Sequence, residues 1–113
     1  MEQKKIDSAI TVYREVLKSA PEAGDALTMI SGDLGNNGYL AQMLELILPF
    51  YEPEKHGPMA GLNLIHASIQ LREKETGLKL CESVERLQRY DLKRYLETLR
   101  AQIKRIVIMN GNI

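Results

Sequence analysis

The chain has 113 residues, which is enough for a single domain. Hydrophobic residues make up 44% of it, but there is no Trp and only one Phe, so any core must be aliphatic. Fifteen basic residues balance fifteen acidic ones, whereas binding to nucleic acid or to an anionic membrane needs a basic surplus. Composition therefore argues against both classes of partner.

The chain also lacks the patterns expected of an exported or membrane-spanning protein. No apolar run approaches the ~20 residues that a membrane helix needs, and the first residues lead directly into an amphipathic segment instead of a signal peptide. The single Cys81 lies in an apolar helical pattern and is followed by Glu82, so we expect a buried, unreactive thiol. A reducing, cytoplasmic compartment fits this cysteine usage.

Apolar residues spaced three and four apart predict three helices in the first half of the chain. The first covers residues 6–18 and the second residues 23–34. The second ends at residues 35–38, because Gly and Asn tolerate positive φ. The third covers residues 40–48, and we expect a kink or an end near Pro49, which has no amide proton to donate.

The second half begins with a predicted loop at residues 52–58, which is rich in proline and charge. A fourth helix is predicted over residues 58–71 and a fifth over residues 78–87. The sixth follows Asp91, a good N-cap residue, and extends to Ile106. No segment alternates with a period of two, so the fold class is all-α, with about six antiparallel helices.

The apolar stripes of the helices recur in the sequence at a constant repeat interval. The step from Ala9 to Met43 equals the step from Met43 to Gly77. The same repeat interval relates further positions of the odd-numbered helices, which are Tyr13, Ile47 and Cys81, and Val16, Phe50 and Val84. In the even-numbered helices it relates Leu27 to Gly61, Ile30 to Leu64, and Leu34 to Ser68.

On these residues the chain resembles the tetratricopeptide-repeat family, whose unit is a helix–turn–helix of about 34 residues. The segment SAITVYREVLKSAP supplies the small Ala9, the aromatic Tyr13, the apolar Val16 and the closing Pro21 of that pattern. Gly38 stands at the glycine between the two helices of a unit.

The chain departs from the family pattern at several positions. Met43 and Ile65 stand where the family has small residues, Lys55 and Arg89 stand where it has the closing proline, and Arg72 replaces the next between-helix glycine. These departures indicate degenerate repeats with altered local packing.

The resemblance implies a right-handed superhelical stack, a tetratricopeptide-like α-solenoid. The expected organisation is one domain, 1–113, with a half repeat at 6–21, repeats at 24–57 and 58–91, and a capping helix at 92–108. A helix without its partner leaves an apolar face bare, so either the first helix packs as a cap or the chain is an excerpt from a longer protein, and we favour the excerpt.

The sequence offers no assembled catalytic or metal-binding set. His56 is expected in a loop and His66 on a helix surface, ten residues away, which is not the spacing of a metal site. A small helical enzyme or metal protein that uses His66 with Gln70 or Glu73 stays as an alternative. We expect no enzyme activity, no cofactor and no metal.

A concave binding face is what the resemblance implies instead, because the first helix of each unit lines that side. The predicted partner-binding residues are Asp25, Thr28, Met29, Met59, Leu62, Asn63, His66, Ile69, Gln70 and Lys93. The expected function is to hold a protein or peptide segment. The alternative is a structural spacer or oligomerisation element that packs against another domain of a larger polypeptide, or that self-associates through its terminal helices and the apolar tail 106–109.

Overall fold

The computed structural model describes residues 3–20 and 23–107. Over these residues the chain is all-helical and has no strand, which confirms the predicted fold class. The helices are α1 (Gln3–Ser19), α2 (Gly24–Asn36), α3 (Leu40–Ile47), α4 (Pro53–His56), α5 (Pro58–Gln70), α6 (Lys74–Glu85) and α7 (Tyr90–Lys104).

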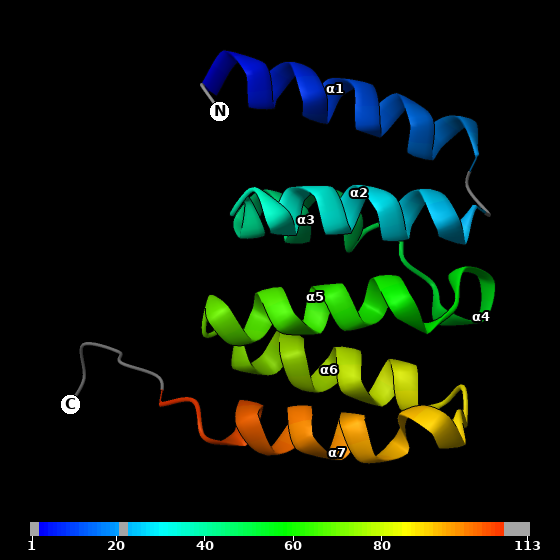
Figure 1. Cartoon of the computed structure of the whole chain (residues 1–113), viewed down its shortest axis with the longest axis vertical. Helices are drawn as coiled ribbons and strands as arrows, with labels where there is room; N and C mark the ends of the chain where they lie inside the picture. Colours follow the sequence, from blue (N-terminus) through cyan, green and yellow to red (C-terminus); the bar gives the residue numbers. More distant parts are fainter. Residues whose placement is uncertain (1–2, 21–22, 108–113) are drawn as a thin grey trace.

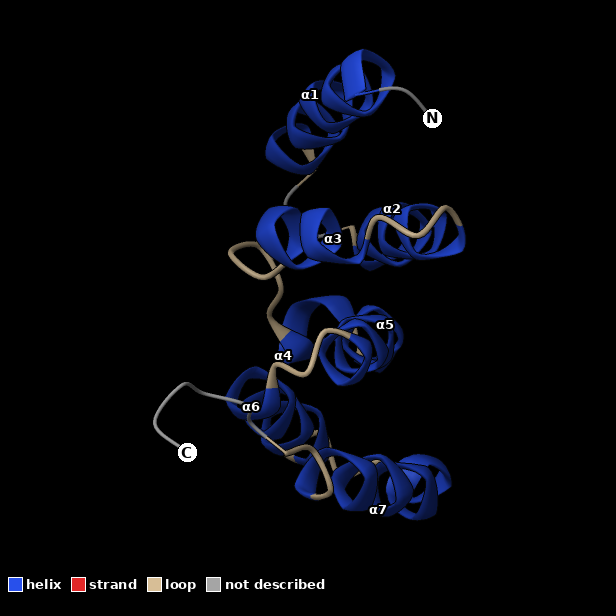
Figure 2. Cartoon of the chain, turned by 90° about the vertical axis from the view of Figure 1, so that its left-hand side faces the viewer, coloured by secondary structure: helices blue, strands red, loops and turns tan. Residues whose placement is uncertain are grey.

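The helices stack along the long axis of the molecule in two layers. One layer holds α2, α5 and α7, the other holds α3 and α6, and α1 lies at the end of the stack above α2 (Figures 1 and 2). Helix α2 packs on α3, and α5 packs on α6, while α3 and α6 each contact the helix that begins the next pair. The shortest dimension of 20 Å is that of two helices side by side.

The repeat interval of the sequence recurs in the backbone of the two complete pairs. Helices α2 and α5 begin at Gly24 and Pro58, and helices α3 and α6 begin at Leu40 and Lys74. Both distances along the sequence equal the repeat interval, which is the step from Ala9 to Met43. The helices of the second pair therefore begin at positions equivalent to those of the first pair. Their first helices also have equal length.

The turns inside the two pairs match as well. In the first, the amide of Tyr39 donates to the carbonyl of Leu34 at 2.9 Å, and in the second the amide of Glu73 donates to that of Ser68 at 2.8 Å. Each bond spans five residues and closes the end of a helix in the Schellman manner. The turn inside each pair is therefore closed in the same way.

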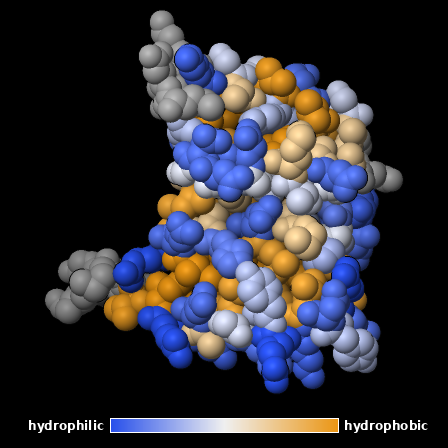
Figure 3. All heavy atoms as spheres, in the orientation of Figure 1, coloured by the Kyte–Doolittle hydropathy of each residue, from blue (hydrophilic) through white to orange (hydrophobic). Residues whose placement is uncertain are grey.

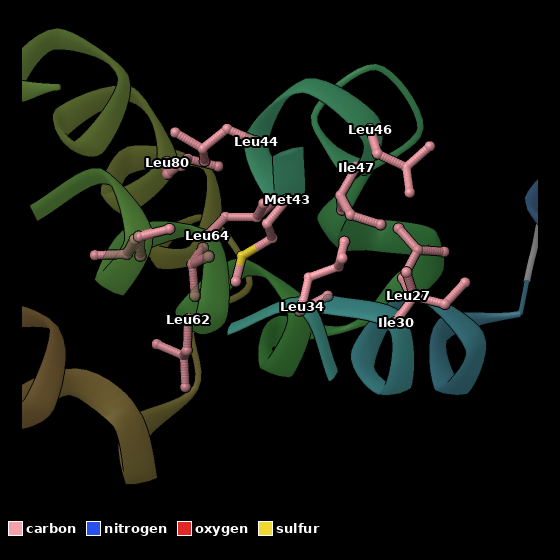
Figure 4. Close-up of a cluster of buried hydrophobic side chains, with 14 of the residues drawn as sticks. Leu27, Ile30, Leu34, Met43, Leu44, Leu46, Ile47, Leu62, Leu64 and Leu80 are labelled. Atoms are coloured by element: carbon pink, nitrogen blue, oxygen red, sulfur yellow. The ribbon is translucent and has the colours of Figure 1, made fainter. Parts of the chain in front are cut away.

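The core between the layers is aliphatic, as the composition requires. In Figure 4 the side chains of Leu34 from α2, Met43 from α3 and Leu64 from α5 point toward one another, and each is at most 2% exposed. Cys81 is fully buried, which confirms the expected thiol environment, and burial raises its pKa.

The predicted loop at residues 52–58 is wrong in one respect, because it contains the single-turn helix α4. His56, which was expected in a loop, ends this helix and is buried. Its Nδ1 accepts a hydrogen bond from the amide of Glu52 at 2.9 Å, and its ring stacks on Tyr51. A single turn leaves no periodic stripe in the sequence, so spacing alone could not predict it.

The last helix also differs from the prediction at both ends. It begins at Tyr90, with Arg89 at the cap position, so Asp91 lies in its first turn instead of capping it. The two Asp91 carboxylate oxygens accept hydrogen bonds from Arg89, which lowers the pKa of that carboxyl. The helix ends at Lys104, and the tail residues 108–109 lie outside the described residues.

Candidate functional site

The layer formed by α2, α5 and α7 presents the face on which the sequence placed the binding residues. These three helices begin on the same side of the molecule and run parallel to one another (Figure 1). Figure 3 views this face and shows hydrophobic and hydrophilic residues interspersed across it. Along α5 the residues that face outward are Met59, Asn63, His66 and Gln70, which follow one another by four, three and four positions.

Asn63 links α5 to α2 through a chain of hydrogen bonds. Its Nδ2 donates to Ser31 Oγ at 2.9 Å, and Ser31 Oγ donates to the carbonyl of Thr28 at 3.1 Å. Thr28 Oγ1 in turn donates to the carbonyl of Gly24 at 3.0 Å. The predicted residue Asn63 therefore stabilises the packing of α5 on α2, whereas the Thr28 hydroxyl bonds within α2.

His66 links α5 to α7 in a comparable way. Its Nε2 is hydrogen-bonded to the hydroxyl of Tyr95, and the two ring centroids lie 5.8 Å apart with the planes tilted by 44°. The sequence did not indicate a contact between Tyr95 and His66, because the two residues lie on different helices and are not one repeat interval apart. Its 42% exposure places it at the edge of the same face.

A hollow of about 200 Å³ lies between the C-terminal halves of α2 and α5. Three of the predicted residues, Asn63, His66 and Gln70, line it together. Gly32 and Gly35 of α2 line the opposite wall, so no side chain fills the space from these two positions. The hollow therefore offers amide and imidazole groups to a ligand.

The other predicted residues have mixed outcomes. Met29 and Met59 are 61% and 54% exposed, and Asp25 and Lys93 are exposed as well. Leu62 differs from the prediction, because it is only 7% exposed and belongs to the core; in Figure 4 it points toward α7. Ile69 is partly buried and packs against the same core.

A second hollow, of about 340 Å³, lies where α6 turns into α7. Lys93 lines it together with Arg89, Tyr90 and Glu97, and Glu85 and Gln88 complete the wall. Tyr90 is 91% exposed, which is unusual for a large aromatic side chain. No spacing in the sequence singles out Tyr90.

Two further hollows lie beside α3. One, of about 410 Å³, lies between α1 and α3, and the other, of about 330 Å³, lies between the α3–α4 segment and α6. Gln42, Glu45 and Leu46 line the first, and the residues one repeat interval later, 76, 79 and 80, line the second. The two hollows therefore lie at equivalent positions, one repeat interval apart.

The balanced net charge conceals a separation of charge along the stack. Residues 23–57 contain five acidic side chains and one basic side chain, whereas residues 86–107 contain seven basic and two acidic. Helix α5, which lies between these segments, carries no Asp, Glu, Lys or Arg. The stack therefore carries an acidic excess in the segment of α2 to α4 and a basic excess in the segment of α7.

Among residues 3–20 and 23–107, no group of three His, Cys, Asp or Glu side chains could hold a metal ion. None of the helices that the structure describes is long and apolar enough to span a bilayer. No protein-family model matches the chain, and no curated protein or solved structure matches it either.

Proposed function

We propose that this chain is a non-catalytic interaction module that binds a peptide or protein segment on the face formed by α2, α5 and α7. The observation that carries the proposal is the exposure of Met29 and Met59 on the face that also contains the hollow lined by Asn63, His66 and Gln70. Figure 3 shows hydrophobic residues among hydrophilic ones on this face, and exposed apolar surface rimmed by polar residues favours a partner.

The chemistry of this face suits an extended segment. Methionine is unbranched and polarisable, so Met29 and Met59 can adapt to different apolar side chains. Gln70 and the ring of His66 offer hydrogen-bonding groups for a partner's backbone, whose amide and carbonyl groups need partners once they are buried. Recognition of this kind needs no nucleophile and no metal.

The repeated backbone supports a tetratricopeptide-like stack as the scaffold of this function. One constant interval relates the helix starts and the turn hydrogen bonds of two successive pairs. In such stacks the first helices of successive units line one continuous binding surface. Helices α2, α5 and α7 hold that position in the proposal.

The direct test is selection of peptides from a random twelve-residue library on the immobilised chain. The Met29→Gln/Met59→Gln variant should lose most of the selected binding, because both side chains are exposed and contact a ligand in this proposal. Exposed substitutions of this kind change stability by about 0.5 kcal/mol or less. The matched control is Val12→Gln/Val16→Gln, which removes two exposed apolar side chains from α1.

Three outcomes are distinguishable in this selection. Enrichment on the native chain and on the α1 control, with loss on the methionine variant, supports the proposal. Equal enrichment on both variants places binding on another surface. If no peptide is enriched on the native chain, the binding function is wrong.

The second candidate is a spacer that self-associates through α1. Val12 and Val16 are 59% and 37% exposed on this helix, which packs chiefly on α2. Sedimentation equilibrium of the native chain and of Val12→Gln/Val16→Gln tests it. A native dimer that the variant abolishes would favour the spacer, and a native monomer would exclude self-association through α1.

A further inference from the structure

The hollow between α2 and α5 reaches through the first layer of helices to side chains of the second. Met43 of α3 and Ala67 of α5 are buried residues that line it. A Cβ built on Gly35 would lie 3.0 Å from the terminal methyl carbon of Met43, so this tip lies close to the glycine. The third buried residue of the lining, Ser31, uses its hydroxyl within the chain, where it accepts from Asn63 and donates to a carbonyl. The floor of the hollow is therefore apolar.

The two glycines that line the hollow have larger counterparts in α5. One repeat interval after Gly32 and Gly35, the chain carries His66 and Ile69. His66 links α5 to α7 through Tyr95, and Ile69 packs against the core. The chain therefore supplies side chains of its own at these positions of α5 and none at the equivalent positions of α2. A partner can supply the missing one.

Size and charge define the group that the hollow can take. Its volume of about 200 Å³ far exceeds the ~10–15 Å³ that one water needs, and lies below the ~300 Å³ at which small-molecule pockets begin. No Asp, Glu, Lys or Arg lines it. A charged side chain placed there would lose its water without gaining a counter-charge. The hollow therefore suits one uncharged side chain.

Amide side chains stand at the ends of the two helices that border the hollow. Asn36 is the last residue of α2 and Gln70 the last of α5; both are exposed and both line the hollow. A carboxamide donates and accepts hydrogen bonds, so each can pair with the backbone of a segment that crosses the hollow. In an extended segment successive side chains point to opposite sides. One side chain can therefore enter while the backbone stays at the rim.

We infer that this hollow takes one aliphatic side chain, of the size of leucine or isoleucine, from an extended segment of a protein partner. The inference rests on the proposed binding function and adds the residue type that the partner must carry. The side chain contacts Met43 and Ala67 on the floor, where the flexible thioether of Met43 adapts to its shape. The backbone on either side of it bonds to Asn36 and Gln70.

Filling the hollow from the protein side tests the inference. A Cβ on Gly32 would meet no atom within 4 Å, so Gly32→Ala and Gly32→Leu add volume at a position with open space. Urea unfolding checks that both variants keep the fold. The matched control is Ala41→Leu, which adds the same side chain at an exposed position of α3 outside the hollow.

The probes are peptides selected on the native chain from the twelve-residue library, each with copies in which one residue is replaced by Ala. We expect one aliphatic position at which Ala weakens binding about tenfold, the factor expected for burying a leucine-sized side chain. Gly32→Leu should weaken the unaltered peptide by a similar factor, and Gly32→Ala by less. On Gly32→Leu the unaltered and Ala-substituted peptides should bind alike. Ala41→Leu should bind as the native chain does.

Each result decides between the proposals. Coupled losses, with the control unchanged, support the aliphatic anchor in the hollow. If selected peptides have no aliphatic anchor, or bind the Gly32 variants as tightly as the native chain, the inference is wrong, and the proposed function stands where the methionine variant loses them. If Gly32→Leu does not fold, Gly32→Ala decides. If the library yields no peptide, both proposals are wrong.

Discussion

Gly32 and Gly61 lie on helices of the same layer but have opposite surroundings. A Cβ at Gly61 would lie 2.7 Å from Val84 Cγ2 and would collide with the Tyr51 hydroxyl, whereas a Cβ at Gly32 would have no atom within 4 Å. We expect Gly61→Ala to lower the free energy of unfolding by about 1–3 kcal/mol, because overpacking displaces neighbours. Gly32→Ala should raise it by about 0.5–1 kcal/mol through helix propensity.

Urea unfolding followed by circular dichroism measures both glycine variants under the same conditions. Both substitutions have the same helical backbone context, so their difference isolates the packing at Gly61. A Gly61→Ala protein as stable as Gly32→Ala would contradict the close approach of α5 to Tyr51 and α6.

Tyr51 provides a prediction about alkaline stability. Its hydroxyl donates to the carbonyl of Gly57 at 2.7 Å, and burial raises its pKa to about 12 from an ordinary value of about 10. Between pH 10 and 12 the unfolded chain loses this proton while the folded chain keeps it, so folding stability falls as pH rises through that window. Tyr51→Phe removes this contribution.

The expected result is a shallower loss of stability above pH 10 in Tyr51→Phe than in the native chain. At pH 8 the variant should be less stable by about 1 kcal/mol, because the hydrogen bond to Gly57 is lost. Urea unfolding at pH 8 to 11.5 gives both quantities. Parallel pH profiles would show that Tyr51 is not protected in the folded state.

At the scale of the element, the turn between paired helices requires a left-handed residue. Gly38 has φ of 81° in the first pair, and Arg72, at the equivalent position of the second pair, has φ of 59°. For residues other than glycine this conformation costs about 1 kcal/mol or more. The two positions are one repeat interval apart, so the two turns share a backbone conformation although their residues differ.

Arg72→Gly should therefore raise the free energy of unfolding by up to about 1 kcal/mol, since Arg72 is exposed and contributes little packing. The reciprocal control is Gly38→Ala, which should lower it by a similar amount. Thermal unfolding of the two variants decides the matter. No change in either variant would mean that these turns adopt another conformation in solution.

Long helices were easier to predict from the sequence than the short one, for a physical reason. A helix of several turns leaves a stripe of apolar residues, so α2, α3 and α5 were predicted within about two residues at each end. Helix α4 is too short to leave a stripe, and its stability comes from contacts such as the stacking of His56 on Tyr51.

The candidate site was predicted in part. The outward residues of α5 follow from helical spacing, but Leu62 was assigned to the surface because apolar residues surround most of that helix and blur its buried face. The pairing of His66 with Tyr95 depends on how α7 lies against α5, which no spacing encodes. The overall composition also did not indicate the separation of charge, because basic and acidic residues are equal in number over the whole chain.

For the whole molecule, we propose that one layer of the two-layer stack is a binding face. A peptide selected from the random library is added to the isotopically labelled native chain, and the backbone amide resonances are followed by NMR. We predict shifts that gather on α2, α5 and α7, near Met29, Met59 and His66, with α3 and α6 little changed. Shifts that gather on α1, α3 or α6, or no shifts with any peptide that the library selects, would contradict the claim.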